Sequence, residues 1–436
     1  MSLENDFKEF IEKLEPTNIE EMKITVGEIA KKLNCSYYGV NGDKESNIYI
    51  VGSIGRTTAI NGVSDLDIIF DLPKSIYEKF NSYNSNGQSA LLQEVKNILK
   101  ERYSNTDISG DGQVVVIEFS KYTVELVPGF KQNDNSFKYP DTHDGGSWKI
   151  TNPLKEIDES IATAEGTNNN FIYIANMLRA WKNKNGFKFG GLLIDTLTYN
   201  FLNDKSEYKD IEFKDYFDVT KELFKYLKEL NKEQNYWFAL GSNQKVYNCD
   251  NGKFISKAKK AYKKIESLDE EDSGINTKLR EIFGSKFPKK NKGEKASSYE
   301  QYYSYRDTEE FIEDKVPVDI KYSIKIDCKV TQDGFRKMLL SNILKEYKFL
   351  SRKKSLEFFI SDLDNDLKNS YDIYWKVKNE GEVAKERDCI RGQVKKYNTD
   401  KIKESTDFKG EHYVECYIVQ NGICVARDKI NVPISN

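Results

Sequence analysis

The sequence has 436 residues, of which 31% are charged and 38% hydrophobic, and its formal net charge at pH 7 is −3. A chain of this length is long enough for two or three domains, each with its own core. No stretch approaches the ~18 consecutive apolar residues of a membrane span, and residues 1–6 are too polar for a signal peptide, so we expect a cytoplasmic protein without a membrane partner. The six cysteines form no C-x-x-C pair and indicate neither a zinc site nor a disulfide framework.

Two helices are predicted at the start of the chain. The first has its apolar positions at helical spacing, at Phe7, Phe10, Ile11 and Leu14. The second follows Thr17-Asn18-Ile19-Glu20, which has the pattern of a capping box, and its apolar face is Met22, Val26, Ile29, Ala30 and Leu33. We expect both helices to precede the strands described next.

Two short strands, residues 49–51 and 65–70, are predicted on either side of a polar, basic loop. The loop suits triphosphate oxygens, since it is rich in small and hydrogen-bonding residues: Gly52, Ser53, Gly55, Arg56, Thr57 and Thr58. Period-two geometry places Asp65 and Asp67 on one face of the second strand. Two carboxylates in an otherwise apolar strand repel each other and are costly to desolvate, so we expect a cation between them, with Mg²⁺ as the natural candidate.

A D-x-D triplet alone is common on exposed strands, where it is only a charged surface. Here the apolar neighbours Ile68, Ile69 and Phe70 indicate a buried strand, and the loop before it favours the functional interpretation.

A third acid is expected, because a two-metal site usually draws on another strand of the sheet. Residues 114–119 and 122–127 are predicted to form a hairpin with its turn at Ser120-Lys121. Glu125 lies in the middle of the second strand, whereas Glu118 lies beside the turn, where water solvates a carboxylate easily. We therefore prefer Glu125 as the third ligand.

These segments resemble a known family. Gly52-Ser53-Ile54-Gly55-Arg56, Ser64-Asp65-Leu66-Asp67 and Val124-Glu125-Leu126-Val127-Pro128 are similar to the bacterial cGAS/DncV-like nucleotidyltransferases of the SMODS class. The resemblance implies an α+β fold: a polymerase-beta-like nucleotidyltransferase core, with a mixed sheet and helices, followed by a helical half.

The resemblance also implies the chemistry of the site. Asp65, Asp67 and Glu125 would be the catalytic and metal-binding residues for two Mg²⁺ ions, with Mn²⁺ as the alternative, and nucleoside triphosphates, ATP among them, would be the substrates. The family more often has aspartate at the position of Glu125, and glutamate lengthens the reach by one methylene. The nucleotide-binding residues would be Gly52, Ser53, Arg56 and Thr57 in the loop, with Lys182 and Arg179 from a later helix.

That later helix is predicted over residues 171–184, with Lys182 at the edge of its apolar stripe Phe171, Ile174, Ala175, Leu178 and Trp181. A lysine there either lies along its apolar neighbours or reaches into a cleft. The family resemblance favours the cleft, with Lys182 on the nucleotide phosphates and Arg179 as its companion.

Residues 253–295 are locally basic, with thirteen Lys and Arg against seven Asp and Glu. The region can bind an RNA or DNA activator through its phosphates. It can equally be the solvated face of an amphipathic helix whose apolar side is Phe254, Ala258, Ala261, Tyr262 and Ile265.

The last part of the chain changes character. A strand is predicted over residues 318–330, a helix over 334–349, and recurrent strands from Tyr371 onward. Residues 373–381, 391–392, 412–418 and 424–428 resemble the AGS-C sensor domain that accompanies SMODS enzymes. Four polar or aromatic residues could form a pocket there or be ordinary core and surface: Trp375, His412, Glu415 and Arg427.

We thus expect four segments. They are a catalytic core with N-terminal helices (1–150), a helical domain that closes the nucleotide cleft (151–283), a lysine-rich linker or loop (284–305) and a smaller, strand-rich α+β sensor domain (306–436). The expected function is Mg²⁺-dependent synthesis of a cyclic di- or trinucleotide second messenger, with release of pyrophosphate. The cyclic product is expected to act on a downstream effector in CBASS-type antiphage defence.

Two alternatives stay open. One is synthesis of linear oligonucleotides without a template, or nucleotidylation of RNA or protein. The other is a nucleotide or nucleic-acid sensor module without catalysis. The proposed reaction needs no protein base, which suits a chain whose only histidines are His143 and His412.

Overall fold

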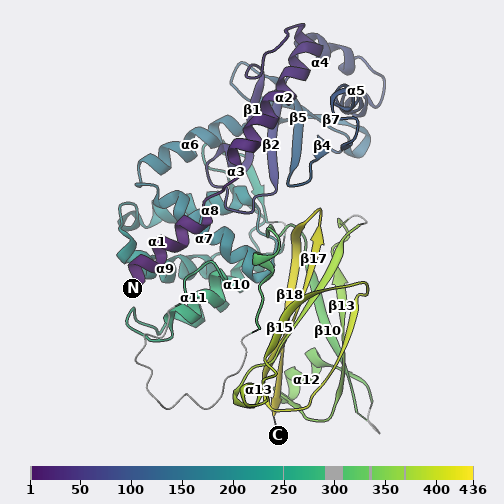
Figure 1. The fold of residues 1–436 in the computed structure, drawn as a ribbon. Coiled ribbons are helices and arrows are strands. Elements are labelled where there is room, and N and C mark those ends of the chain that lie inside the picture. The colour runs from purple at the N-terminus through teal and green to yellow at the C-terminus, as the bar shows by residue number, and fades with distance from the viewer. Residues whose placement is uncertain (1, 249, 290–307, 333–335, 368–369, 436) are drawn as a thin grey trace. The chain divides into compact units, whose positions relative to one another are not determined.

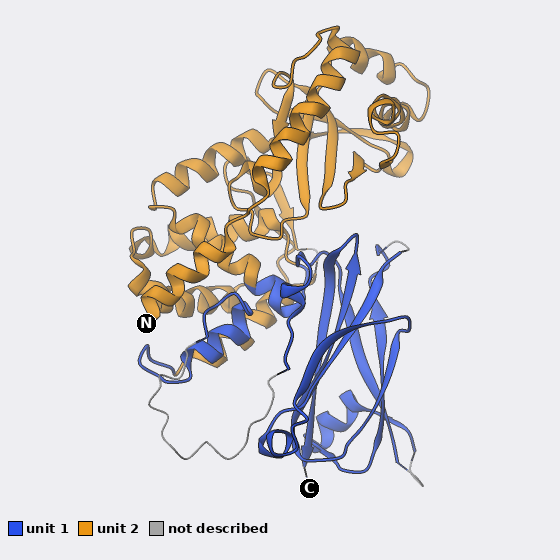
Figure 2. Ribbon diagram, in the orientation of Figure 1, with its two compact units in different colours: residues 1, 181–188, 268–436 blue, residues 2–180, 189–267 orange. Residues whose placement is uncertain are grey.

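The computed structural model describes residues 2–248, 250–289, 308–332, 336–367 and 370–435, which form an α+β structure (Figure 1). These residues divide into two compact units (Figure 2). Unit 2 contains residues 2–180 and 189–267, and unit 1 contains residues 181–188 and the described part of 268–436. None of the described helices combines the length and the apolar composition that a membrane crossing requires.

The chain begins with helices α1 (Leu3–Leu14) and α2 (Ile19–Tyr38). The predicted apolar faces of both helices are buried. The predicted capping box is wrong, because the second helix begins at Ile19, so that Asn18 and not Thr17 occupies the cap, and Asn18 makes no side-chain cap bond. Glu20 instead pairs with Lys23 at 2.8 Å.

A mixed sheet forms the centre of the first half of unit 2. Its strands are β1 (Ile48–Ile50), β2 (Asp65–Asp71), β3 (Asp107–Asp111), β4 (Val114–Glu118) and β5 (Thr123–Lys131), in the spatial order β1-β2-β5-β4-β3. Only β2 and β5 run parallel; the other neighbours are antiparallel. Strands β6 (Phe137–Asp141) and β7 (Ser147–Thr151) continue from β5. The predicted hairpin between β4 and β5 is confirmed, with Phe119 N donating to Tyr122 O at 3.0 Å across the turn.

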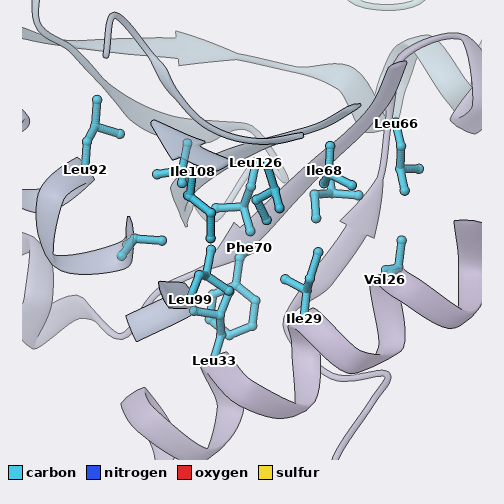
Figure 3. Packing of buried hydrophobic residues seen from close by; sticks show 14 of the residues in the cluster. Val26, Ile29, Leu33, Leu66, Ile68, Phe70, Leu92, Leu99, Ile108 and Leu126 are labelled. Atoms are coloured by element: carbon cyan, nitrogen blue, oxygen red, sulfur yellow. The ribbon is translucent and has the colours of Figure 1, made fainter. Parts of the chain in front are cut away.

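One face of this sheet packs against α2 and α5 (Gly87–Arg102), with α4 (Lys74–Asn81) beside α5. Figure 3 shows Leu66, Ile68 and Phe70 of β2 and Leu126 of β5 directed toward Ile29 and Leu33 of α2 and Leu99 of α5. Alternation along β2 and β5 therefore leaves their other side chains on the opposite face of the sheet.

The second half of unit 2 is mainly helical. Its helices are α6 (Pro153–Glu165), α7 (Asn170–Asn185, whose last turn belongs to unit 1), α8 (Gly191–Asp204), α9 (Tyr216–Glu229) and α10 (Lys253–Ile265). Short 3-10 helices lie at Ser206–Tyr208 and Phe213–Asp215, and another lies between β6 and β7 at His143–Gly145. The hairpin of β8 (Tyr236–Phe238) and β9 (Lys245–Tyr247) was not predicted, because three-residue strands are too short to show a periodic pattern.

Helix α10 buries the apolar side that the sequence predicts, including Phe254, Ala258 and Ile265. Lys259, Lys260, Lys263 and Lys264 are exposed on its other side. The amphipathic interpretation accounts for these lysines, and a nucleic-acid activator stays a prediction.

Unit 1 contains two sheets that enclose one core. The four-stranded sheet has the order β11-β10-β13-β16, and the five-stranded sheet has the order β12-β18-β17-β14-β15. The strands are β10 (Ile324–Thr331), β11 (Met338–Leu339), β12 (Leu350–Ser351), β13 (Ser355–Leu363), β14 (Asp372–Lys378), β15 (Arg391–Tyr397), β16 (Lys401–Ser405), β17 (Gly410–Gln420) and β18 (Ile423–Ser435). Buried side chains from both sheets, such as Phe358 and Trp375, belong to one cluster.

The remaining helices of unit 1 are α11 (Ile275–Phe283), α12 (Leu340–Tyr347), α13 (Glu382–Glu386) and a 3-10 turn at Ile312–Asp314. The C-terminal strands are confirmed, whereas the predicted strand 318–330 begins only at Ile324 and the predicted helix 334–349 is shorter than expected. Most of the predicted linker 284–305 lies outside the described residues.

Candidate active site

Strands β2 and β5 bring the three predicted acids onto one face of the sheet. Their parallel register pairs Asp67 with Glu125, and Asp65 with Thr123. Asp65, Asp67 and Glu125 are each half-buried, while their strand neighbours Leu66 and Val124 are fully buried in the core on the other face. Glu118, the rejected candidate, is exposed and stands next to Thr123 at the end of β4.

The donor set suits a hard divalent cation, because it consists of carboxylates from two adjacent strands. In the part of the chain that the structure describes, however, no group of three or more His, Cys, Asp or Glu side chains is gathered closely enough to hold a metal ion. Carboxylates repel one another, and an ion's charge offsets this repulsion when they converge. Metal binding by the three acids therefore stays a prediction.

Gly52 lies directly against the carboxylate of Asp67. Its φ is +64°, and a Cβ atom built on it would lie 1.8 Å from Asp67 Oδ2 and 2.6 Å from Asp67 Cγ. Val51 N, one residue earlier, donates to Asp67 O at 2.9 Å. Only glycine fits here, both because of the left-handed backbone and because the turn and the carboxylate are in contact.

The loop that follows β1 is closed by its own hydrogen bonds. After the single helical turn α3 (Gly52–Gly55), Ser53 O accepts from Thr58 N at 2.9 Å and from Ala59 N at 3.1 Å. Thr57 is exposed with φ +60°, and its hydroxyl donates to Arg56 O at 2.6 Å. The loop therefore has a fixed shape beside Asp67.

Arg56 and Arg179 both bind Asp195 of α8, which is fully buried. Arg56 Nε donates to Asp195 Oδ2 at 2.9 Å, and Arg179 donates to Oδ1 at 2.7 Å and to Oδ2 at 3.0 Å. Thr58 Oγ1 donates to the same carboxylate at 2.9 Å. Burial acts to raise the pKa of Asp195, but Arg179 and Arg56 outweigh it and hold the pKa below its ordinary value.

These contacts give each arginine a structural partner and join the loop to α7 and α8. Contact of either arginine with a phosphate stays a prediction. Asp195 was not predicted as a site residue, although an acid within the otherwise uncharged run 190–201 and an arginine, Arg179, between apolar neighbours could have indicated a buried ion pair.

Helix α6 supports the same loop. Ser160 Oγ donates to Arg56 O at 2.7 Å, and Glu156 Oε2 lies 3.8 Å from a terminal nitrogen of Arg56. Burial raises the pKa of Glu156, against the opposing effects of Arg56 and of a hydrogen bond from Ser242.

Lys182 belongs to unit 1, where its ammonium is bound by the segment before β10. Nζ donates to Ile320 O at 2.9 Å and lies 3.2 Å from Asp319 Oδ1. Asn183 donates to Val318 O at 2.8 Å. The predicted role of Lys182 on nucleotide phosphates is therefore untested, and its observed partners are a carboxylate and a carbonyl.

The four residues considered for a C-terminal pocket have different surroundings. Trp375 lies in the apolar core, and Glu415 and Arg427 form a buried ion pair at 3.1 Å. The His412 ring lies between Glu380 N and Phe408 O and lines a small cavity that none of the other three residues lines. These contacts fit the core-and-surface interpretation, and a pocket shared by the four residues stays a prediction.

The chain matches two family models. Residues 1–163 match the Second Messenger Oligonucleotide or Dinucleotide Synthetase (SMODS) domain, and residues 306–435 match the Adenylyl/Guanylyl and SMODS C-terminal sensor domain. No curated protein matches the chain.

Several solved structures are similar to the chain. The E. coli MS115-1 CdnC structure with ATP has 15% identity and a TM-score of 0.49, and the match covers 66% of this chain and 99% of that one. The Rhodothermus marinus CdnE c-UMP-AMP synthase has 14% identity and a TM-score of 0.44, over 61% and 98% of the two chains. The Vibrio cholerae di-nucleotide cyclase DncV has 12% identity and a TM-score of 0.44, over 66% and 87%.

Proposed function

We propose that the sheet face with Asp65, Asp67 and Glu125, called here the acidic face, joins nucleoside triphosphates into a cyclic di- or trinucleotide, with release of pyrophosphate. The premise is that the chain belongs to the cGAS/DncV-like nucleotidyltransferases of the SMODS class and carries a C-terminal AGS-C domain. One observation supports this proposal above all. Asp67 and Glu125 are register partners on adjacent parallel strands, Asp65 lies on the same face, and the backbone of Gly52 touches the Asp67 carboxylate.

Asp65, Asp67 and Glu125 would hold the divalent cations, with Mg²⁺ preferred for its affinity for carboxylate and phosphate oxygens. Two such ions, when bound, lower the pKa of an attacking ribose hydroxyl and stabilise the leaving pyrophosphate. The chain's own part is positioning: the sheet register fixes the spacing of the acids, and the loop from Gly52 to Thr58 is held in place by Asp195 and Ser160. Neither histidine lies on β2 or β5, which suits a reaction without a protein base.

The proposal extends to the product's role. The matched family is described as a second-messenger synthetase, so the cyclic product would act in the cytoplasm on a downstream effector, in a CBASS-type antiphage pathway. Several relatives are named for the products they make, among them c-UMP-AMP and c-di-GMP.

The test is product analysis. The full-length protein is incubated with ATP, GTP, CTP, UTP and Mg²⁺, with and without phage-derived RNA, then treated with phosphatase and analysed by mass spectrometry. We expect a phosphatase-resistant product that disappears in an Asp65→Asn/Asp67→Asn double variant. Asp71→Asn is the matched control, because Asp71 ends the same strand and accepts a hydrogen bond from Lys131 N at 2.8 Å, which asparagine can still accept.

Two results would count against the proposal. A product that phosphatase degrades would identify a linear oligonucleotide, and the same yield from the double variant and the wild type would place the chemistry elsewhere.

A further inference from the structure

Unit 2 contains a large cavity that the proposed reaction does not use. Its volume is about 740 Å³, and it lies between helices α6 and α8 and the segment 234–243, which includes strand β8. Small-molecule sites in proteins usually measure about 300–1,000 Å³. None of Asp65, Asp67 and Glu125 lines this cavity.

The wall formed by residues 239–244 is held firmly against α6. Gly241 has φ +68°, and a Cβ atom there would lie 2.0 Å from Lys155 O. Ser242 donates to Glu156 at 2.9 Å, and the side chain of Gln244 accepts from Asn152 N at 3.0 Å and donates to Ile150 O at 3.1 Å. The cavity therefore has a preformed wall, which lowers the entropic cost of binding a ligand.

An aromatic ring is open for stacking at this cavity. Tyr236 and Phe238 lie on the same face of β8, with ring centroids 5.5 Å apart. The ammonium of Lys245 lies 4.2 Å from the centroid of Tyr236 and so covers one face of that ring. Phe238 is 57% exposed, so a planar ligand can cover its ring. Trp237, on the other face of the strand, is buried against Phe254 and fixes the strand from behind.

The polar side chains that line the cavity carry amides, tyrosine hydroxyls and one carboxylate. Asn200, Asn235 and Asn243 line it and each carries a side-chain amide. Glu159 accepts the hydroxyl of Tyr199 and keeps further acceptor sites on its two oxygens. The described residues that line the cavity include no lysine or arginine, and Lys245, which lies beside it, covers one face of the Tyr236 ring.

We propose that this cavity binds a guanine base, in the form of a free nucleoside, at a site separate from the three acids. The planar base stacks on Phe238, the amides of Asn200 and Asn243 supply both donors and acceptors, and Glu159 accepts the two N–H groups that guanine presents on its pairing edge. Adenine carries only its exocyclic amine as a donor on that edge, so Glu159 distinguishes the two bases. The absence of cations from the lining favours a free nucleoside over a nucleic-acid strand, whose affinity comes mainly from its phosphates.

The experiment is calorimetric titration of the full-length protein with guanosine in EDTA, where a metal-dependent substrate site contributes nothing. We expect saturable binding of guanosine that is tighter than that of adenosine. Phe238→Ala should weaken it about tenfold or more, since a base stacked on an aromatic ring gains that much. Glu159→Gln should weaken guanosine binding and reduce the preference over adenosine.

Two matched variants serve as controls. Tyr247 is 60% exposed on the same hairpin and does not line the cavity, so Tyr247→Ala should bind guanosine as the wild type does. The Asp65→Asn/Asp67→Asn variant should also bind it normally, and circular dichroism should show that every variant is folded.

Several outcomes would overturn the assignment. The first is that guanosine does not bind at millimolar concentration, or that adenosine binds equally well. The second is that the folded Phe238→Ala and Glu159→Gln variants bind guanosine as the wild type does. The third is that the Asp65→Asn/Asp67→Asn variant loses binding, which would place the base in the active site. A single-stranded oligonucleotide that binds far more tightly than guanosine would assign the cavity to a strand instead. Failure of product synthesis would leave the binding result standing, because the titration measures no catalysis.

Discussion

The substitution Gly52→Ala places a methyl group where the Asp67 carboxylate lies. The new Cβ would be 1.8 Å from Asp67 Oδ2, whereas an ordinary contact begins near 3.4 Å. The left-handed backbone adds about 1–2 kcal/mol of strain for any residue other than glycine. To relieve the collision, the carboxylate or the loop must move by about 1 Å or more, and a misplacement of that size costs about a hundredfold in rate. We therefore expect product formation to fall about a hundredfold or more.

Gly39 provides the matched control. Its φ is +68°, nearly the same as at Gly52, but nothing lies within 4 Å of a Cβ built on it. Gly39→Ala should therefore carry the same strain without the collision. Each ~1 kcal/mol lowers the melting temperature of a domain of this size by about 2–4 °C. Initial rates of pyrophosphate release and thermal melts on both variants separate the two effects. Activity within threefold of wild type in Gly52→Ala, or an equal loss in Gly39→Ala, would refute the reasoning.

Three further predictions concern other carboxylates. Glu125→Gln should abolish product formation and Glu118→Gln should leave it within about threefold, since only Glu125 is the register partner of Asp67; equal losses would contradict the choice of third acid. Asp195→Asn leaves two buried guanidinium groups without their counter-charge, so it should lower the free energy of unfolding, measured by urea titration, by about 3–5 kcal/mol. A change below about 1 kcal/mol would mean that water reaches the two arginines. Burial acts to raise the pKa of Glu309, but Lys376 and its other partners outweigh it and lower the pKa to about 2. The stability that Glu309 contributes is therefore complete above its unfolded pKa of about 4.3 and is lost as the pH falls toward 2. After allowance for solvent screening, Glu309→Gln should remove about 2 kcal/mol of that acid-dependent stability, and a variant that melts like the wild type at every pH would refute this.

Much of the acidic face could be predicted from local sequence. The alternation of Asp65 and Asp67 with buried neighbours fixes which side chains share a face of β2, and the position of Glu125 between Val124 and Leu126 does the same for β5. The register between the two strands is different, because it depends on how the sheet is assembled across more than fifty residues. The grouping of the three acids was predicted from the need of a two-metal site for a third carboxylate on another strand, together with the family resemblance, and not from periodicity.

The arginines show what local sequence could not provide. Arg56 is predicted to bind nucleotides because its loop suits phosphates, and Arg179 because of the family resemblance. Their observed partner, Asp195, is 139 residues from Arg56 in the chain, and no spacing rule connects the two. A buried cation always needs a partner, but which acid provides it is a property of the tertiary structure.

The last turn of α7 affects how the C-terminal domain can be separated from the rest of the chain. The family model for that domain starts at residue 306, yet Lys182 and Asn183, more than a hundred residues earlier, satisfy the carbonyls of Ile320 and Val318. A fragment cut at 306 would leave these two carbonyls to water and would remove the buried helix end that covers them. If such a sensor domain is exchanged between enzymes, in evolution or in engineering, the new chain must therefore also provide a helix end that can bind these two carbonyls.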